Sequence, residues 1–291
     1  MTRRFVFAAC LLILGCADRQ AADLVERLKT RDAEELQQVT GKLVRLPNAI
    51  AVPALRQGLR AEKWRTRYMS CQLLGRFQAL EAIPDLIVAL RDSIGGVRAQ
   101  AAGALGQLVA GQATQPLIAL LDDDNEVVQI AAADALARIG SPEALPSLCR
   151  LSESRSLAVR VAAIKALGPC HDDTLAPLLS AQALNLTHQA LDDVYIRVRI
   201  AAIVSLRALE YRGAVDDLLR LLRDPSPEVV HVAVQALGEI TGVDHPAWQN
   251  HRSPEMALVT EALGSIVATT KNAAVRERAR ESLAKIAESG L

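Results

Sequence analysis

Several side chains that could take part in binding or catalysis gather in one short segment, residues 241–255 (TGVDHPAWQNHRSPE). The segment contains two of the five histidines of the chain and one of its two tryptophans. Imidazole and carboxylate groups serve as metal ligands or as general acids and bases, and an indole is a frequent anchor at protein interfaces. We expect the partner-binding residues of this segment to be Asp244, His245, Trp248, His251 and Arg252.

A second polar segment, residues 180–196 (SAQALNLTHQALDDVYI), adds Tyr195 to the candidate partner-binding residues. A third cluster is formed by His171, Asp172 and Asp173. Metal binding needs three or four converging donors, and only neighbours in the sequence are visible here. The sequence therefore predicts neither a metal site nor a cofactor.

The sequence contains none of the common catalytic motifs. There is no G-x-S-x-G, no GK[ST] phosphate loop, no H-E-x-x-H and no dinucleotide-binding fingerprint. We therefore predict no catalytic residues and expect that the chain is not an enzyme. The alternative is a metal- or ligand-binding enzyme that uses residues 241–255.

The first sixteen residues (MTRRFVFAACLLILGC) have the pattern of an export signal. Arg3 and Arg4 precede an apolar run over residues 5–14, which is shorter than the roughly 18 residues of a membrane span. The sequence Ile-Leu-Gly-Cys over residues 13–16 resembles a bacterial lipobox. This resemblance implies that residues 1–15 are removed, that Cys16 carries the lipid and that residues 16–21 form a tether.

Such processing implies a location in the bacterial cell envelope, facing the periplasm. Residue 17 is Ala, and Asp18 follows it, so the choice between the inner and outer membrane stays open. An ordinary cleaved signal peptide, with an incidental cysteine at position 16, is the alternative.

The composition favours an all-α protein with a sizeable core. Hydrophobic residues make up 51% of the 291 residues, charged residues 23% and aromatic residues only 3%. This balance excludes a disordered chain. With 33 basic and 33 acidic residues, the formal net charge is zero, which argues against nucleic-acid binding.

The body of the chain is a series of similar ten-residue segments with the template V-R-x-x-A-A-x-A-L-G. Segments begin at equal intervals at residues 66, 97, 128 and 159, and later ones begin at 198, 229 and 275. Template positions one, five, eight and nine share one face of a helix, so each segment predicts a half-buried helix. We interpret the small residues as points of close helix contact and the final glycine as a left-handed C-cap.

A second series of helices, each with a proline in its first turn, lies between the template helices. Its prolines are Pro53, Pro84, Pro116, Pro146 and Pro177. Residues 22–46 and 273–291 read as polar helices that cap the two ends. The sequence therefore predicts an α-solenoid of about eight helical hairpins over residues 22–291, with insertions at 180–196 and 241–255.

The repeat resembles the HEAT-like repeat first described in phycobilisome lyases. This resemblance implies a ladder in which the arginine at template position two pairs with an acid such as Asp92, Asp124 or Asp224. Its arginines are Arg67, Arg98, Arg160, Arg199 and Arg276. We favour this structural role over an anion-binding stripe, because the arginines follow the repeat period.

Three cysteines remain in the predicted mature chain apart from Cys16. Cys71 falls at a small core position of a template helix. Cys149 and Cys170 could form a disulfide in the periplasm, and both the paired and the free states stay open.

These observations favour a non-catalytic, membrane-anchored scaffold that binds a protein or peptide partner at the bacterial cell envelope. Solenoids present extended surfaces to their partners, and insertions often lie on one face of the array.

Overall fold

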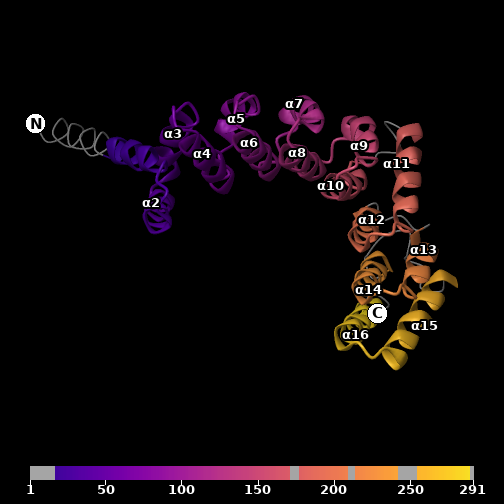
Figure 1. Cartoon of the computed structure of the whole chain (residues 1–291). Coiled ribbons are helices and arrows are strands. Elements are labelled where there is room, and N and C mark those ends of the chain that lie inside the picture. The colour runs from indigo at the N-terminus through magenta and orange to yellow at the C-terminus, as the bar shows by residue number, and fades with distance from the viewer. Residues whose placement is uncertain (1–16, 171–176, 209–213, 242–253, 289–291) are drawn as a thin grey trace, which may run out of the picture. The chain divides into compact units, whose positions relative to one another are not determined.

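The computed structural model describes residues 17–170, 177–208, 214–241 and 254–288. These residues form helices joined by short turns, and no strand occurs among them. The helices follow one another in pairs (Figure 1). The predicted all-α solenoid of about eight hairpins is therefore confirmed.

The first helix of each pair begins the repeat, and in every pair but the first the second helix carries the template. The first helices are α1 (17–27), α3 (Asn48–Gly58), α5 (Ile83–Ala89), α7 (Thr114–Ala119), α9 (Leu145–Leu151), α11 (Pro177–Ala190), α13 (Ala214–Leu221) and α15 (Pro254–Thr269). The second helices are α2 (Ala33–Arg45), α4 (Trp64–Arg76), α6 (Gly95–Gln107), α8 (Glu126–Ile139), α10 (Leu157–Leu167), α12 (Ile196–Ala208), α14 (Pro227–Thr241) and α16 (Ala273–Glu288).

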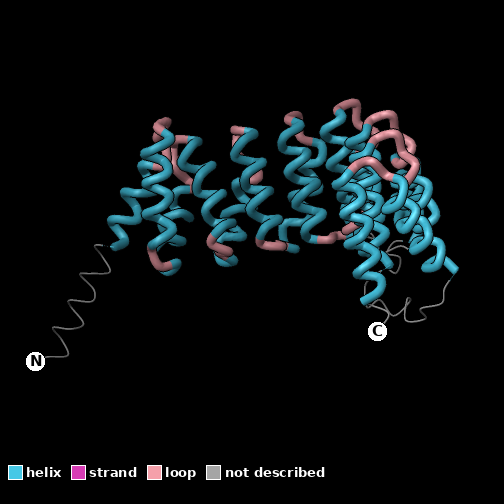
Figure 2. The backbone as a smooth tube through the Cα atoms, turned by 90° about the horizontal axis from the view of Figure 1, so that it is seen from below, coloured by secondary structure: helices cyan, strands magenta, loops and turns pink. Residues whose placement is uncertain are grey.

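Contacts between Cα atoms divide the chain into two compact units, residues 1–139 and residues 140–291. Within each unit the helices stand side by side, and the turns lie at the helix ends (Figure 2).

Close packing of second helices holds the first unit together. A Cβ atom added to Gly106 of α6 would lie 2.8 Å from the Cα of Ala135 in α8. One added to Gly75 of α4 would lie 3.1 Å from the Cα of Ala104 in α6. Only a residue without a side chain fits at these contacts, because protein interiors are close-packed.

This packing corrects the predicted role of the template glycine. The Gly168 backbone has φ −60°, and Gly75 and Gly106 lie inside the last turns of their helices. None of the three adopts the left-handed conformation, and their role is close helix contact. Within the described chain, positive φ angles occur instead at Gln78 (51°), Val109 (48°) and Gly140 (69°), just after α4, α6 and α8.

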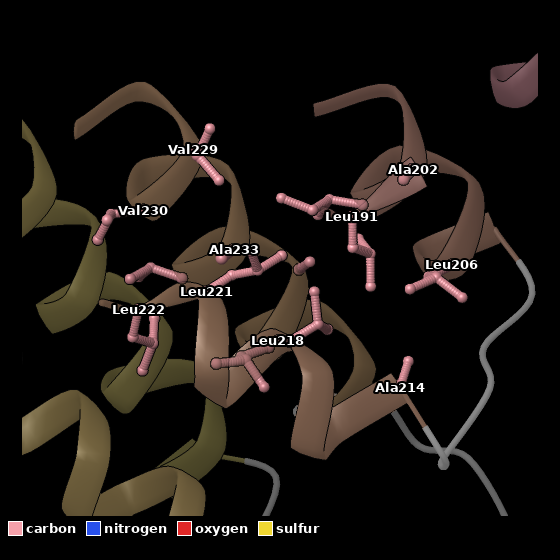
Figure 3. Packing of buried hydrophobic residues seen from close by; sticks show 14 of the residues in the cluster. Leu191, Ala202, Leu206, Ala214, Leu218, Leu221, Leu222, Val229, Val230 and Ala233 are labelled. Carbon is pink, nitrogen blue, oxygen red and sulfur yellow. The ribbon is translucent and has the colours of Figure 1, made fainter. Parts of the chain in front are cut away.

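The core of the second unit consists of aliphatic side chains from α10 to α16. Figure 3 shows Leu218 and Leu221 of α13 extending toward the α12 and α14 helices, where Leu206 and Ala233 lie. All four are buried. Small and branched side chains fill this core, in keeping with the low aromatic content of the chain.

The prolines of the first helices only partly match the prediction. Pro84 and Pro146 lie in the first turns of α5 and α9, and Pro177 begins α11. Pro53 is different, since it is the sixth residue of α3. The helix starts earlier there because Pro47 occupies its N-cap, ahead of Asn48.

Two predicted irregular segments are largely helical. Residues 180–190 of the first predicted insertion form most of α11, which at 14 residues is twice as long as α9. Ala183, Thr187 and Ala190 are buried. They are spaced by four and then three residues, which places them on one buried face of the helix. Residues 17–27 are likewise helical, so α1 includes most of the predicted tether, and the fully buried Ala21 extends the apolar face of Leu24 and Leu28.

The polar pair at the N-terminus and the last helix occupy the predicted places. Asp32 caps α2 by accepting hydrogen bonds from the backbone N–H groups of Glu34 and Glu35. Glu35 in turn accepts hydrogen bonds from Arg27, at 2.9 Å and 3.2 Å, which joins α1 to α2.

Candidate binding surface at the helical turns

The turns between first and second helices carry a repeated arrangement of arginine and aspartate. Arg98 of α6 donates from Nη1 to the carbonyl oxygen of Asp92, 2.8 Å away in the preceding turn. Its Nε and Nη2 donate to the two carboxylate oxygens of Asp123, each at 2.8 Å, in the turn of the next repeat. Asp123 also accepts a hydrogen bond from the backbone N–H of Asn125 at 2.9 Å. One arginine thus joins two successive turns.

The same contacts recur at two other repeats. Arg67 holds Asp92 with Nε and Nη2 at 2.6 Å and 2.9 Å, and Arg199 holds Asp224 at 2.8 Å and 2.9 Å. The side chains are largely buried, with 11% of Arg199 and 5% of Asp224 exposed. These pairs form the predicted ladder. In each described pair the aspartate follows the arginine by 25 residues, so the acid after Arg98 is Asp123 rather than the predicted Asp124.

The ladder alters the ionisation of its members in the first unit. The hydrogen bond from Arg98 holds the pKa of Asp123 below its ordinary value. Burial alone would raise the pKa of Asp92, yet hydrogen bonds from Arg67 and from the backbone N–H of Ile94 leave this pKa lowered. The same pairing raises the pKa of both arginines. The ladder groups of this unit are therefore fully charged near neutral pH.

Four repeats depart from this arrangement, and in one of them, that of α14, Val230 stands in place of the arginine. Gln129 replaces the arginine in α8 and donates to the carbonyl oxygen of Asp123 at 2.8 Å. Arg276 of α16 donates to the carbonyl oxygen of Thr270 at 2.6 Å. Arg160 of α10 donates from Nη1 to the carbonyl oxygen of Ser154 at 2.9 Å and more weakly to that of Arg155. Neither Arg160 nor Arg276 has a carboxylate partner among the described residues.

We call the surface formed by these turns the turn edge. In the first unit it comprises residues 59–63, 90–94 and 123–125, and in the second unit residues 152–156, 191–195, 222–226 and 270–272, each with the first turn of the second helix that follows. Where a ladder arginine joins two consecutive turns, side chains on these two turns lie next to one another.

Apolar side chains are exposed along the turn edge of the first unit. The exposed fractions are 43% for Trp64, 38% for Ile94 and 61% for Val127. The Trp64 ring packs edge-on against Tyr68, with centroids 6.4 Å apart, and the Arg65 guanidinium lies 5.1 Å from its centroid. These contacts hold a large amphipathic side chain in place at the surface.

The second unit exposes a similar group, Val194, Tyr195 and Ile196, at 84%, 50% and 40%. The guanidinium of Arg160 lies 5.7 Å from the centroid of the Tyr195 ring. The structure thus places Tyr195, a predicted partner-binding residue, on the turn edge. The other five predicted partner-binding residues (Asp244, His245, Trp248, His251 and Arg252) lie outside the described residues.

The exposed residues Trp64, Ile94 and Val127 were not predicted as site residues. Each lies two to four residues before template position two, outside the apolar positions that fix the helix face. An apolar residue at the polar start of a second helix is the signal that would have identified them.

The surface of the second unit also contains two hollows. The larger, of about 770 Å³, lies between α13 and α15 and is lined by Leu219, Leu222, Leu258 and Ile266 together with polar residues. The smaller, of about 200 Å³, lies next to the turn edge and includes Arg160, Asp193 and Glu153 in its wall.

Other predicted features lie partly outside the described chain. The cluster of residues 171–173 and the lipidation candidate Cys16 are outside it. Over the described ranges, no three His, Cys, Asp or Glu side chains are grouped as metal ligands would be. None of the helices described is both long and apolar enough to cross a bilayer.

The three described cysteines are buried and not joined by disulfides, so Cys149 and Cys170 do not form the disulfide that the sequence left open. Burial raises the pKa of Cys71 and of Cys170 to about 12 and also raises the pKa of Cys149. All three behave as small core residues.

Comparison with known proteins supports the repeat architecture. A family model described as HEAT repeats matches residues 52–126, 114–185 and 184–284. Comparison with curated protein sequences gives no match.

Three solved structures resemble the chain at low sequence identity. YibA from Escherichia coli is 17% identical, with a TM-score of 0.58, over 93% of this chain and 95% of YibA. The complex of CpcE and CpcF of phycocyanin lyase from Nostoc sp. is 21% identical, with a TM-score of 0.54, over 83% of this chain and 95% of the matched chain. An engineered protein is 21% identical, with a TM-score of 0.50, over 93% of this chain and 82% of its own. At these identities the resemblance concerns the fold alone.

Proposed function

Since the chain belongs to the HEAT-repeat family, we propose that it is a non-catalytic scaffold whose turn edge binds a protein or peptide partner. The observation that carries this proposal is the row of exposed apolar side chains on turns that the ladder joins together. Solenoids of this kind use extended surfaces for binding. The surface does not depend on a mobile loop, because the arginine at template position two of the same repeat holds each of the turns 59–63, 90–94 and 191–195, and Gln129 holds the turn 123–125.

The composition of the turn edge suits a protein interface. Tryptophan, tyrosine and arginine are enriched at the centres of interfaces, and Trp64, Tyr68 and Arg65 form such a group in the first unit. Val127 and Val194 add exposed aliphatic area on the turn edge of other repeats. A partner that covered these residues would remove them from water without ordering a flexible segment.

We also propose that the chain is anchored to a bacterial membrane through a lipid on Cys16, with its repeats in the periplasm. The support for this part is the sequence alone, from the basic start through the apolar run to the lipobox-like residues 13–16. Burial of each methylene group of the lipid contributes about 0.8 kcal/mol, so several acyl chains would hold the protein firmly.

The anchor is tested by Cys16→Ser in cells that carry the full chain. We expect this variant to leave the membrane fraction. Cys10→Ser is the matched control, since residue 10 lies within the predicted signal and should not affect anchoring. A Cys16→Ser protein that stays in the membrane fraction to the same extent as the control would refute the anchor.

The binding proposal is tested by placing a photo-crosslinking amino acid at positions 64, 127 and 194 of the chain in intact cells. We expect a specific protein product from at least one of these positions. Gln72 is a suitable control position, because it is exposed on α4 outside the turn edge. If all three positions give no more product than position 72, the turn edge is not the binding surface.

Metal analysis of the purified chain separates the scaffold from an enzyme or metal protein that uses residues 241–255. We expect no stoichiometric metal. Bound metal that is lost in both His245→Ala and His251→Ala would refute the scaffold proposal and favour that alternative.

A further inference from the structure

We propose that Arg160, together with Val194 and Tyr195, forms a binding site for a carboxylate side chain of the protein partner. The site rests on the proposed scaffold function and specifies the chemistry of its partner in the second unit. Here the repeated ladder keeps its arginine, but this arginine forms no ion pair with an acid among the described residues.

The comparison of equivalent nitrogens defines the site. In Arg67, Arg98 and Arg199, Nη1 donates to carbonyl oxygens of the arginine's own turn, while Nε and Nη2 hold both oxygens of an aspartate. Arg160 keeps the first contact, since its Nη1 donates to Ser154. Its Nε and Nη2 have no acceptor among the described residues. The two nitrogens that recognise a carboxylate elsewhere are thus available here.

The repeat that follows Arg160 is longer than the regular repeats, and the aspartate of its turn does not pair with Arg160. Elsewhere the aspartate lies 25 residues after its arginine, but the residue at that distance from Arg160 is Asn185, inside the long helix α11. Asp193, further along the chain, occupies the equivalent turn. It still accepts a hydrogen bond from the backbone N–H of Tyr195, as the ladder aspartates do at their own turns. The ring of Tyr195, rather than a carboxylate, lies close to the guanidinium of Arg160.

Space for an incoming group exists next to Arg160. The hollow of about 200 Å³ has polar walls that include Ser152, Glu153 and Asp193 and an apolar part that includes Ile164 and Val198. Neither Glu153 nor Asp193 forms an ion pair with Arg160 in the described structure. A single acidic side chain is of a suitable size for this hollow.

The surroundings favour a carboxylate over a phosphate group. Two acidic side chains line the hollow, and they would repel a dianion more strongly than a single negative charge. The planar guanidinium matches the two oxygens of a carboxylate, and three repeats of this chain show that geometry. The exposed Val194, Tyr195 and Ile196 would contact apolar residues beside the acid. We infer a partner segment in which Asp or Glu is flanked by apolar side chains.

The first test measures the purified full chain by NMR of arginine Nε–Hε groups. The Hε of Arg98 and Arg199 should exchange slowly with water, and that of Arg160 should exchange faster. The probe is a capped peptide of residues 88–97 (VALRDSIGGV), in which Asp92 is the single acid. It should shift the Arg160 signal, while the Asp92→Asn peptide should not. An Arg160 Hε as protected as that of Arg98 would overturn the proposal, because an internal acid would then occupy the site.

The second test uses the photo-crosslinker at position 194 in cells and maps the crosslinked partner segment. The segment should contain Asp or Glu, and Arg160→Met should lower the yield about tenfold, as expected for loss of a charge-assisted hydrogen bond. Changing the partner's acid to its amide should lower the yield to the same degree. Arg138→Met is the matched control, because it removes the same charge from an exposed position at the end of α8, outside the turn edge. Circular dichroism checks that both variants fold.

The outcomes separate this inference from the proposed function. An unchanged yield in Arg160→Met, or a partner segment without an acid, would overturn the inference and leave the scaffold function intact. The inference would also be overturned, and the scaffold function left intact, if position 64 or 127 gave a product and position 194 gave none. The absence of product at all three positions would overturn both.

Discussion

Replacing Gly106 with alanine should destabilise the chain, although alanine is the better helix former. The new Cβ would lie 2.8 Å from the Cα and 3.0 Å from the Cβ of Ala135. Carbon atoms in contact prefer a separation of about 3.5–4.0 Å, so α6 and α8 would have to move apart. Overpacking of this kind costs about 1–3 kcal/mol. The gain in helix propensity is well below about 1 kcal/mol here, because Gly106 is the penultimate residue of α6.

Gly103→Ala is the matched control on the same helix. An added Cβ at this position meets no atom within 4 Å. The substitution should stabilise the chain by about 0.5–1 kcal/mol, since alanine restricts the unfolded chain and favours the helix. The two variants make the same chemical change, so the difference between them, about 2 kcal/mol, measures the helix contact.

Urea unfolding followed by circular dichroism in the far ultraviolet gives the free energies of unfolding. Repeat arrays can unfold in more than one step, so the slope and the midpoint of each transition should be compared between variants. In native-state hydrogen exchange, the amide groups of α6 and α8 should lose the most protection. A Gly106→Ala variant as stable as Gly103→Ala would refute the packing role of the template glycine.

Other predictions follow from single described residues. Thr66→Val should stabilise the chain by about 1 kcal/mol in urea unfolding, because the buried Thr66 hydroxyl has no hydrogen-bond partner and the change conserves shape. Val109→Gly should raise the free energy of unfolding by up to about 1 kcal/mol in urea unfolding. The left-handed backbone of this exposed valine costs more than the conformational freedom that glycine adds to the unfolded chain. Asp123→Asn should be less stable than the unchanged chain at pH 7. Because the pKa of Asp123 is lowered on folding, its contribution is complete above its unfolded pKa of 3.8 and is lost as the pH falls through the folded value, so the two urea midpoints should converge in acid. Iodoacetamide at pH 8 should label Cys71 and Cys170 only after unfolding in urea, as mass spectrometry can measure, since the pKa of each is about 12 in the fold.

The sequence predicts the elements well because each helix carries its own signals. The regular spacing of the template and its apolar positions can be read from single helices, and they suffice to define the pairs from α3 to α10. The ladder arginines could be identified for the same reason, since their position repeats with the template. A local pattern needs no knowledge of the neighbouring repeat.

Features that depend on a neighbouring repeat could not be predicted in this way. A glycine at the end of a helix fits a cap or a close contact equally well, and only the position of Ala135 shows that Gly106 is a contact. The choice of Asp123 over Asp124 is likewise fixed by the arginine of the preceding repeat. At Arg160 the prediction of a ladder contact is wrong, because its guanidinium lies beside the ring of Tyr195 and forms no ion pair with Asp193 of the equivalent turn.

The ladder has a consequence for how an array of this kind can grow. Each paired arginine holds an acid 25 residues later, and this interval is shorter than one regular repeat. A tandem duplication of one whole repeat therefore adds one acid and one arginine in the correct places. The new acid pairs with the arginine of the preceding repeat, and the new arginine pairs with the acid of the following repeat. A duplication of any other length changes the interval between an arginine and its acid. The lengthened repeat that follows Arg160 is an example. Regular repeats can thus be added without new compensating changes, whereas a change in length leaves a cation available for another use.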